Sequence, residues 1–240
     1  MFTVGLRYIQ FANKQSLADF ELSIAEINVG YPNKVKNRIK IPNTNIYYDY
    51  ANVFGDLYEE RILEYTFLIA GPYALNETEM ERYKADVANW LMPGQEHYLF
   101  DSAIPFFYFI GEVQNGPEWE QVDNGYGTFK VKFSCYPYKI KQDDEFDDLW
   151  DSFDFENDIA QDLSFAVNGE KEIKVYNTGS VAVYPKLVVT GQVEISVNGF
   201  SHTYTAGTYE DKLWKLARDL STLTLKGNGT LEIHFHKEVL

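Results

Sequence analysis

Short runs in which apolar and polar residues alternate recur along the chain. Successive side chains of a β-strand point to opposite faces of a sheet, so this alternation is typical of half-buried strands. Aromatic residues, which favour strands, make up 16% of the 240 residues. The runs before residue 140 are TVGLRYIQF, DFELSIAEINV, ERILEYTFLIA, EHYLFD, IPFFYFIGEV, EWEQV and GTFKVKFSCYPY. We therefore expect a mainly β fold.

One segment, NETEMERYKADVANWLM, has the period of a helix instead. Asn76 suits the N-cap, acidic residues follow in the first turn, and Pro93-Gly94 supplies a stop. Its apolar residues recur at spacings of three and four and form one stripe: Met80, Tyr83, Val87, Trp90 and Leu91. We expect a single substantial helix, at about residues 77–92, packed on a sheet.

The composition changes after residue 142. The stretch DDEFDDLWDSFDFEND is rich in acidic residues and has no basic ones. Such a segment repels itself, which predicts an exposed linker, with Phe146, Leu149, Trp150, Phe153 and Phe155 anchoring it to a neighbouring surface. A metal loop is the alternative, but the alternating ligands and central glycine of an EF-hand are missing. We expect a β domain over residues 1–142, an acidic linker over 143–162 and a second β domain over 163–240.

The region after the linker contains three Asn-Gly pairs, each thirty residues from the next. They are Asn168-Gly169, Asn198-Gly199 and Asn228-Gly229. Asn-Gly suits the type I′ turn, which needs positive φ at both central residues, so the pairs predict three hairpins of one sandwich. Pro185 can occupy the first position of a strand, and Gly191 is expected to end that strand or kink it.

Residues that would form an active site are not grouped in any known motif. The chain has no G-x-S-x-G elbow and no glycine-rich phosphate loop. His234 and His236 could share one face of a strand and suit a metal, but no third ligand is evident. The single cysteine, Cys135, lies in an alternating run that predicts burial. We expect no catalytic residue, no metal and no cofactor.

The formal net charge is −15, which argues against nucleic acid as a bound partner because phosphate binding needs clustered Lys and Arg. The first residues, MFTVGLRYIQ, lack the apolar core of a secretory signal, and no apolar run approaches membrane-spanning length. We expect a protein made in a cytosol that does not insert into a membrane by itself.

Two long stretches resemble a known family. The segment RIKIPNTNIYYDYANVFGDLYEERILEYTFLI, the helix ending in WLM and the run YLFDSAIPFFYFIGEV resemble the amino-terminal domain of distal tail proteins of long-tailed, non-contractile bacteriophages. The family pattern is an Ile-Pro-Gly turn, an aromatic or acidic stretch, a Gly and then Tyr-Glu-x-Arg. It corresponds here to Ile41-Pro42, Tyr47 to Tyr50, Gly55 and Tyr58 to Arg61. Asn43 replaces the usual Gly, and asparagine tolerates the left-handed conformation better than most residues.

The stretch from YNTGSVAVYPKLVVTG to LTLKGNGTLEIHFH resembles the second, galectin-like domain of the same family. The resemblance implies two β-sandwich-like domains, the first forming a ring. It implies a homohexameric hub at the distal end of a tail tube, within the virion. Its partners would be the tail tube protein and a tail-tip or tail-associated baseplate protein. DNA would pass through the ring without sequence-specific binding.

The residues that we expect to contact other subunits, partners or ligands are mostly aromatic. Five between Pro42 and Tyr58 lack the period that would bury them in their own domain, so we expect a subunit interface at Tyr47, Tyr48, Tyr50, Phe54 and Tyr58. The apolar run from Phe106 to Ile110 is either a strand buried on both faces or another subunit contact. The alternative function is a carbohydrate-binding sandwich for host attachment, with Tyr204, Tyr209 or Trp214 contacting a sugar or a partner.

Overall fold

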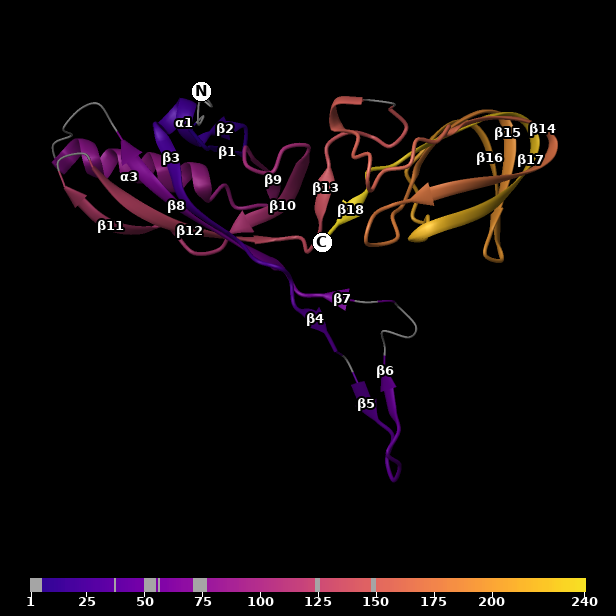
Figure 1. Ribbon diagram of the computed structural model, residues 1–240, viewed down its shortest axis with the longest axis horizontal. Coiled ribbons are helices and arrows are strands. Elements are labelled where there is room, and N and C mark those ends of the chain that lie inside the picture. Colours follow the sequence, from indigo (N-terminus) through magenta and orange to yellow (C-terminus); the bar gives the residue numbers. More distant parts are fainter. Residues whose placement is uncertain are drawn as a thin grey trace. The chain divides into compact units, whose positions relative to one another are not determined.

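The computed structural model describes residues 6–36, 38–49, 55, 57–70, 77–123, 126–147 and 150–240. The chain divides into two compact units, residues 1–139 with residue 240, and residues 140–239. Both consist mostly of β-strands, which confirms the predicted fold class (Figure 1). The boundaries predicted for the linker stay a prediction, and the galectin-like architecture of the second domain stays one too.

The main sheet of the first unit is antiparallel and runs in the order β2-β1-β9-β10-β12-β8-β3, with β11 also paired to β12. The predicted runs match these strands with two exceptions. Among the described residues of TVGLRYIQF only the last three form a strand, β1, and DFELSIAEINV begins in a short helix, α1 (Ser16–Phe20). The strands are β1 (Ile9–Phe11), β2 (Lys14–Gln15), β3 (Leu22–Val29), β8 (Arg61–Ala70), β9 (His97–Asp101), β10 (Phe107–Val113), β11 (Glu118–Asp123) and β12 (Tyr126–Cys135).

The long helix α3 (Glu77–Leu91) covers the apolar face of this sheet, as predicted. Met80, Val87, Trp90 and Leu91 are buried, and the Tyr83 hydroxyl donates to the Phe20 carbonyl at 2.8 Å. The Trp90 ring stacks on Phe20 with 4.6 Å between ring centroids, and its Nε1 donates to the Phe11 carbonyl at 2.8 Å. The apolar stripe of the helix is therefore core contact.

The run from Phe106 to Ile110 is not buried on both faces. Phe109 is buried, but Phe106 is exposed and has a positive φ of 68° in the turn before β10. On the opposite face of the strand, Tyr108 is half-buried and contacts Tyr98 and Phe100 of the neighbouring strand β9. The prediction of a doubly buried strand is therefore wrong, and the alternative of a subunit contact stays a prediction.

The second unit is built on one antiparallel sheet in the order β14-β17-β15-β16. Its strands are unusually long: β14 (Ser164–Asn177), β15 (Lys186–Val197), β16 (Phe200–Tyr209) and β17 (Asp219–His234). Two short strands, β13 (Lys139–Lys141) and β18 (Glu238–Val239), pair with each other. Pro185 directly precedes β15, one residue before the first strand position at which it was predicted.

Glycines let this sheet curl so that its apolar face closes on itself (Figure 1). Gly169, Gly227, Gly191 and Gly229 lie beside one another on three neighbouring strands. A Cβ atom at Gly229 would lie 1.8 Å from the Thr190 carbonyl oxygen, so no other residue fits there without a shift of the backbone. Gly191 has a φ of 72° and kinks β15, as predicted.

Two of the three predicted hairpins are wrong. Asn198 and Gly199 have φ values of 48° and 82° and form the turn between β15 and β16, as predicted for type I′. Asn168-Gly169 and Asn228-Gly229 lie instead within β14 and β17, and the two asparagines pair with each other across the ladder. The glycines of these two pairs serve the bend of the sheet.

The acidic segment is attached to the second unit at both of its ends. Asp144 accepts a hydrogen bond from the Phe235 backbone N–H at 3.0 Å and lies 3.0 Å from His234 Nδ1, and Phe146 stacks on His234. At the other end, the buried carboxylate of Asp158 pairs with Lys141 at 3.1 Å and with Lys237. Between these points lies a short 3₁₀ turn, η1 (Trp150–Ser152).

Candidate functional site: an exposed two-stranded arm

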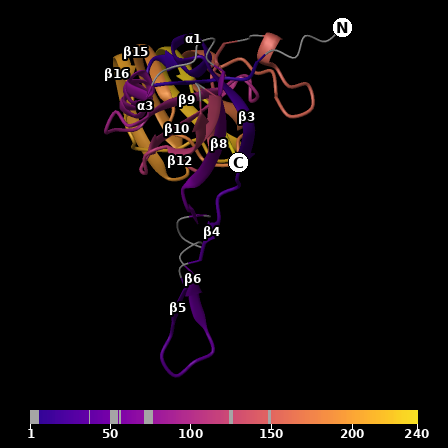
Figure 2. The same ribbon diagram turned by 90° about the vertical axis from the view of Figure 1, so that its left-hand side faces the viewer.

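The described residues between 30 and 60 form a narrow antiparallel arm that continues strands β3 and β8 (Figures 1 and 2). Its ladders are β4 (Lys34–Val35) with β7 (Leu57–Tyr58), and β5 (Arg38–Lys40) with β6 (Tyr47–Asp49). The sequence predicted an aperiodic loop for Pro42 to Tyr58. The described residues of that stretch instead form the tip and the returning strand of a hairpin.

A tight turn closes the tip of the arm. Thr44 N–H donates to the Ile41 carbonyl at 3.3 Å, with Pro42 and Asn43 between them, and Asn43 has a φ of 62°. Proline followed by a residue of positive φ is typical of a type II turn. Asn43 therefore adopts the left-handed conformation that asparagine tolerates, and the turn forms with Asn43 at this position.

The Tyr-Glu-x-Arg motif forms the root of the arm. Glu59 accepts a hydrogen bond from Asn33 Nδ2 at 3.1 Å, and Glu60 accepts one from the Ser134 hydroxyl. Arg61 is buried, with its guanidinium 5.7 Å from the ring centroids of both Tyr31 and Phe109. Burial lowers the pKa of Arg61, and its Nε and Nη2 have no acceptor among the described residues. These contacts fix the point at which the arm leaves the sheet.

The tip half of the arm has one apolar face that no described part of the chain buries. Ile39 lies opposite Tyr48, and the Ile41 N–H donates to the Ile46 carbonyl, so these four side chains share one face of the ribbon. All four are exposed, Tyr48 by 54% and Ile46 by 62%. An isolated two-stranded hairpin is marginally stable in water, and a free-standing apolar face is typical of a contact surface.

The basic residues of the arm lie in its outgoing half. Residues 33–46 hold Lys34, Lys36, Arg38 and Lys40 and no acidic residue, whereas the whole chain has a net charge of −15. Arg38 and Lys40 lie on the ribbon face opposite Ile39, together with Tyr47. Asp49 pairs with Arg38 across the ladder, and residues 47–60 also hold Asp56, Glu59 and Glu60, so residues 30–60 carry no formal net charge. The property that a partner of the arm has to match is therefore its apolar face.

Three of the five predicted interface residues lie among the described residues of the arm. Tyr47 and Tyr48 are exposed on β6, and Tyr58 is half-buried at the root, where its ring meets Tyr138 edge-on at 5.8 Å. Tyr50 and Phe54 lie outside the described residues. Sequence reasoning missed Ile39, Ile41 and Ile46. The alternation of Arg38, Ile39, Lys40 and Ile41 was the signal that could have identified two of them.

The second predicted cluster, in the second unit, belongs to its core. Tyr204 is 1% exposed and Trp214 6%, and Trp214 Nε1 lies 3.2 Å from the Tyr204 hydroxyl. Tyr209 is partly buried and packs edge-on against Tyr204. Because the faces of Tyr204 and Trp214 are covered by neighbouring side chains, they are not available for stacking on a sugar from solvent. The structure gives no support to a carbohydrate contact at these residues.

Tyr65 and Asp101, two buried titratable groups of the first unit, are paired with each other. The Tyr65 hydroxyl donates to Asp101 at 2.9 Å, and burial raises the pKa of both side chains. Cys135 is buried as predicted, which raises its pKa to about 12. Among the described residues no three His, Cys, Asp or Glu side chains are grouped to hold a metal ion. None of the helices in the described ranges has the length and hydropathy of a membrane span.

Comparison with known proteins identifies the fold. No family model and no curated protein sequence matches the chain. Among solved structures, the chain is similar to SPP1 Dit (gp 19.1), described as a paradigm of the hub adsorption apparatus in phages that infect Gram-positive bacteria. The TM-score is 0.66 at 12% identity, over 98% of this chain and 100% of that one. The phage p2 baseplate, in its activated conformation with Sr, is matched at a TM-score of 0.44 and 9% identity over 97% of this chain and 98% of that one.

The chain therefore has the fold of a phage distal tail protein along nearly its whole length. The resemblance of its sequence to that family is confirmed at the level of the fold.

Proposed function

We propose that this protein is a structural component of a phage virion that forms a homohexameric hub at the distal end of the tail tube. The ring links the tail tube protein to a tail-tip or tail-associated baseplate protein and leaves a central channel for DNA. The observation that carries this proposal is the fold shared with the SPP1 hub protein over both units. The role is one of assembly rather than of catalysis.

The exposed arm supports assembly as its function. Its apolar face, made of Ile39, Ile41, Ile46 and Tyr48, needs a cover that the described part of the chain does not supply. In a closed ring each copy provides the same contact to the next, so one arm per subunit is enough to join all six. Burying an apolar side chain contributes about 1.5–3 kcal/mol, and two such residues per contact would outweigh the modest repulsion between acidic surfaces.

The net charge fits a ring that DNA crosses without binding. Six copies carry 6 × −15 = −90 formal charges, so the summed field disfavours adhesion of phosphate groups. Contacts to the tube and to the tail tip are expected on the two opposite faces of such a ring. The protein is synthesised in the host cytoplasm and is then incorporated into the phage tail.

The test is the native mass of the purified protein, together with images of its particles. We expect hexamers with an open centre, in equilibrium with smaller species as the concentration falls. Replacing Ile39 and Tyr48 with Ser removes one aliphatic and one aromatic side chain from the arm face, and should weaken association at least tenfold while the circular dichroism spectrum stays unchanged.

The matched control is Tyr184→Ser, which removes an exposed aromatic ring from the second unit. It should associate as the parent does. A parent protein that stays monomeric up to its solubility limit would contradict a self-assembling ring. Association of the double variant at the parental strength would show that the arm is not the joint.

A further inference from the structure

The buried face of β8 ends in a charged side chain at the root of the arm. Buried residues occupy alternate positions along the start of this strand, and Arg61 belongs to the same row as Leu63 and Tyr65. Arg61 is 2% exposed, and arginine stays protonated in proteins. Burying a charge is costly unless the charge is paired and hydrogen-bonded. Within the described part of the chain no carboxylate forms an ion pair with Arg61, so the side chain lacks a counter-charge there.

The two nitrogens of Arg61 that lack partners define what the side chain can bind. Nε and Nη2 are both buried, and neither has a hydrogen-bond acceptor in the described ranges. The N–H groups of Nε and Nη2 form one edge of the guanidinium and point in parallel, at a spacing that matches two oxygens of a carboxylate or a phosphate. The rings of Tyr31 and Phe109 lie against the guanidinium instead, each with its centroid 5.7 Å from the guanidinium carbon. Arg61 therefore holds an unused pair of donors suited to an oxyanion.

A second cation lies beside Arg61. Lys139 is half-buried, with its Nζ 4.9 Å from the ring centroid of Phe107. Phe107 and Phe109 are two residues apart on β10, so the rings that contact the two cations share one face of the strand at a spacing of about 7 Å. Burial and the neighbouring charge of Arg61 lower the pKa of Lys139. An anion between the two cations would offset both charges and relieve their repulsion.

The carboxylates next to this pair in the sequence are occupied, and one exposed ring covers the guanidinium. Glu59 accepts a hydrogen bond from Asn33, and Glu60 accepts one from Ser134. Tyr31, in the connection between β3 and β4, is 82% exposed. Because so little of Tyr31 is buried, turning its ring away from the guanidinium loses little apolar contact. Rotation of this one side chain would therefore give an anion access to the donors.

We propose that Arg61 and Lys139 together bind one oxyanion group, a carboxylate or a phosphate, at the root of the arm. Arg61 donates from Nε and Nη2 to two oxygens of the group, and Lys139 offsets the remaining charge. Both cations and the rings that they contact belong to the first unit, so the site exists whether or not the protein forms the proposed ring. Two sources supply this chemistry: a free anion from solution, or an aspartate or glutamate side chain of a neighbouring copy.

Inorganic phosphate is the probe for this site, and chloride at equal ionic strength is the reference, so that general screening cancels. Phosphate should slow hydrogen exchange in β8 and β10, measured by mass spectrometry, and leave exchange in β15 and β17 unchanged. At ten times its apparent dissociation constant, a ligand that binds only the folded unit raises protection about elevenfold. Acetate should also protect β8 and β10, because two oxygens are enough for the donor edge of Arg61.

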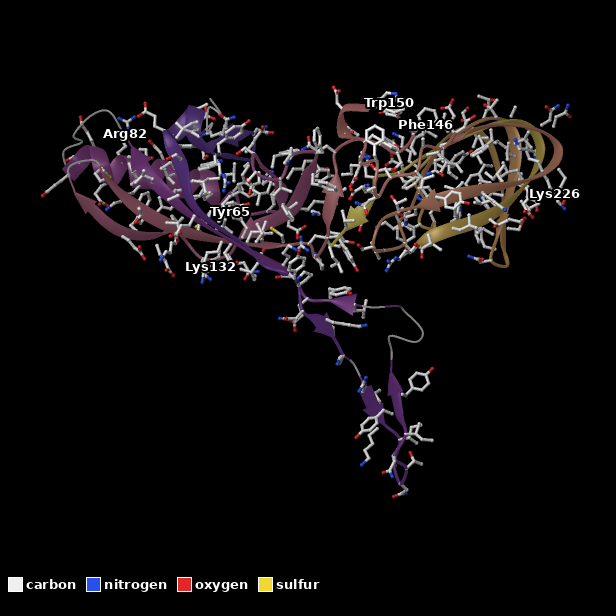
Figure 3. The ribbon with its side chains drawn as sticks, viewed as in Figure 1. Tyr65, Arg82, Lys132, Phe146, Trp150 and Lys226 are labelled. Atoms are coloured by element: carbon white, nitrogen blue, oxygen red, sulfur yellow. The ribbon has the colours of Figure 1, made fainter. Side chains whose placement is uncertain are left out.

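Two variants each disable one half of the site. Lys139→Met keeps an apolar stem against Phe107 and removes the charge, which should weaken phosphate binding about tenfold. Arg61→Lys keeps a charge but loses the parallel pair of N–H groups, and should weaken binding at least as much. The matched control is Lys132→Met, which removes an exposed lysine from β12 of the same sheet (Figure 3 labels Lys132). It should bind phosphate as the parent does.

Protection by phosphate no greater than that by chloride, or phosphate binding of Lys139→Met at the parental strength, would overturn the site. The Lys139→Met result decides the matter if Arg61→Lys proves too unstable to measure. Purified hexamers distinguish the two sources. A free anion is the ligand if each subunit of the hexamer binds one phosphate as tightly as a single subunit does, whereas a neighbour's carboxylate is the ligand if phosphate lowers the native mass. A parent that stays monomeric would contradict the proposed hub, and the phosphate test of the site would still decide.

Discussion

The first unit covers the apolar face of its sheet with a helix, whereas the second closes the apolar face of its sheet on itself. In the first, α3 supplies Val87, Trp90 and Leu91 to a core shared with β1, β8 and β12. In the second, the residues buried along β15 stay at odd positions on both sides of Gly191, from Leu187 to Val197. One continuous face therefore lines the interior of the curl.

The two units differ in the kind of substitution that destabilises their cores most. A helix spreads its contact over a stripe of large side chains, so loss of one leaves a cavity whose cost grows with its volume. A sheet that closes on itself depends on a few positions where the backbones of two strands lie in contact. At these positions only glycine fits, because any side chain would meet the neighbouring backbone. We expect the first unit to be sensitive to truncation and the second to enlargement.

Trp90→Ala should have the largest effect. It removes a buried ring that stacks on Phe20 and the N–H that satisfies the Phe11 carbonyl. Loss of a buried tryptophan costs about 3–5 kcal/mol, so the free energy of unfolding of the first unit should fall by that amount. Hydrogen exchange read by mass spectrometry measures protection separately in β8 and in β17, and protection should fall only in β8.

Two controls separate the causes of that loss. Asn89→Ala changes an exposed position on the same helix and should stay within about 0.5 kcal/mol of the parent. Trp90→Phe keeps an aromatic ring against Phe20 but leaves the Phe11 carbonyl without its donor, which should cost about 1–3 kcal/mol. Equal loss of protection in both units after Trp90→Ala would mean that they do not unfold independently, and the contrast between them would fail.

Gly229→Ala should have the next largest effect, and in the second unit. The added methyl group would meet the Thr190 carbonyl oxygen, a backbone atom of the neighbouring strand. Overpacking costs about 1–3 kcal/mol, and contact with backbone should place this variant at the upper end, with protection lost in β17.

Gly199→Ala is the matched comparison for this substitution. Gly199 has a φ of 82° and no atom within 4 Å of the added Cβ, so only backbone strain opposes the change, at about 1–2 kcal/mol. If Gly229→Ala lowered the free energy of unfolding less than Gly199→Ala, the bend would not depend on close approach of the strands.

The same contrast explains what the sequence could predict. The helix was recognisable because its stripe and its stop signal agree, and the strands were recognisable from alternation. The bend of the second sheet was not recognisable from the sequence. Asn-Gly indicates only that the backbone can adopt positive φ, and this is needed both in a hairpin turn and in a kinked strand. Only the register of β14 with β17 distinguishes Asn168-Gly169 from Asn198-Gly199, and register is a long-range property.

The arm shows a similar limit. Of its aromatic residues, Tyr47 and Tyr48 are exposed as expected, whereas Tyr58 is half-buried and packs against Tyr138. Its hairpin form was missed because the pairing of β5 with β6 and that of β4 with β7 are out of step. Residue numbers of paired positions sum to 87 in one ladder (38 + 49) and 92 in the other (34 + 58). The return segment of the chain therefore has more residues than the outgoing one, and the alternation that would have indicated a hairpin is interrupted in the sequence.

The smallest effect on stability is expected from cutting the acidic segment, which lies within the second unit and should be dispensable for both cores. Its middle has an exposed turn between two anchors, Asp144 and Asp158, and neither anchor lies in the first unit. A protease specific for acidic residues should therefore cut first between residues 147 and 156, ahead of the acidic positions of the hydrogen-bonded arm. Two resistant fragments should result, and protection in both β8 and β17 should survive, because the nick breaks no core contact. First cleavage in a strand, or simultaneous loss of protection in both units after the nick, would show that the chain behaves as one cooperative unit.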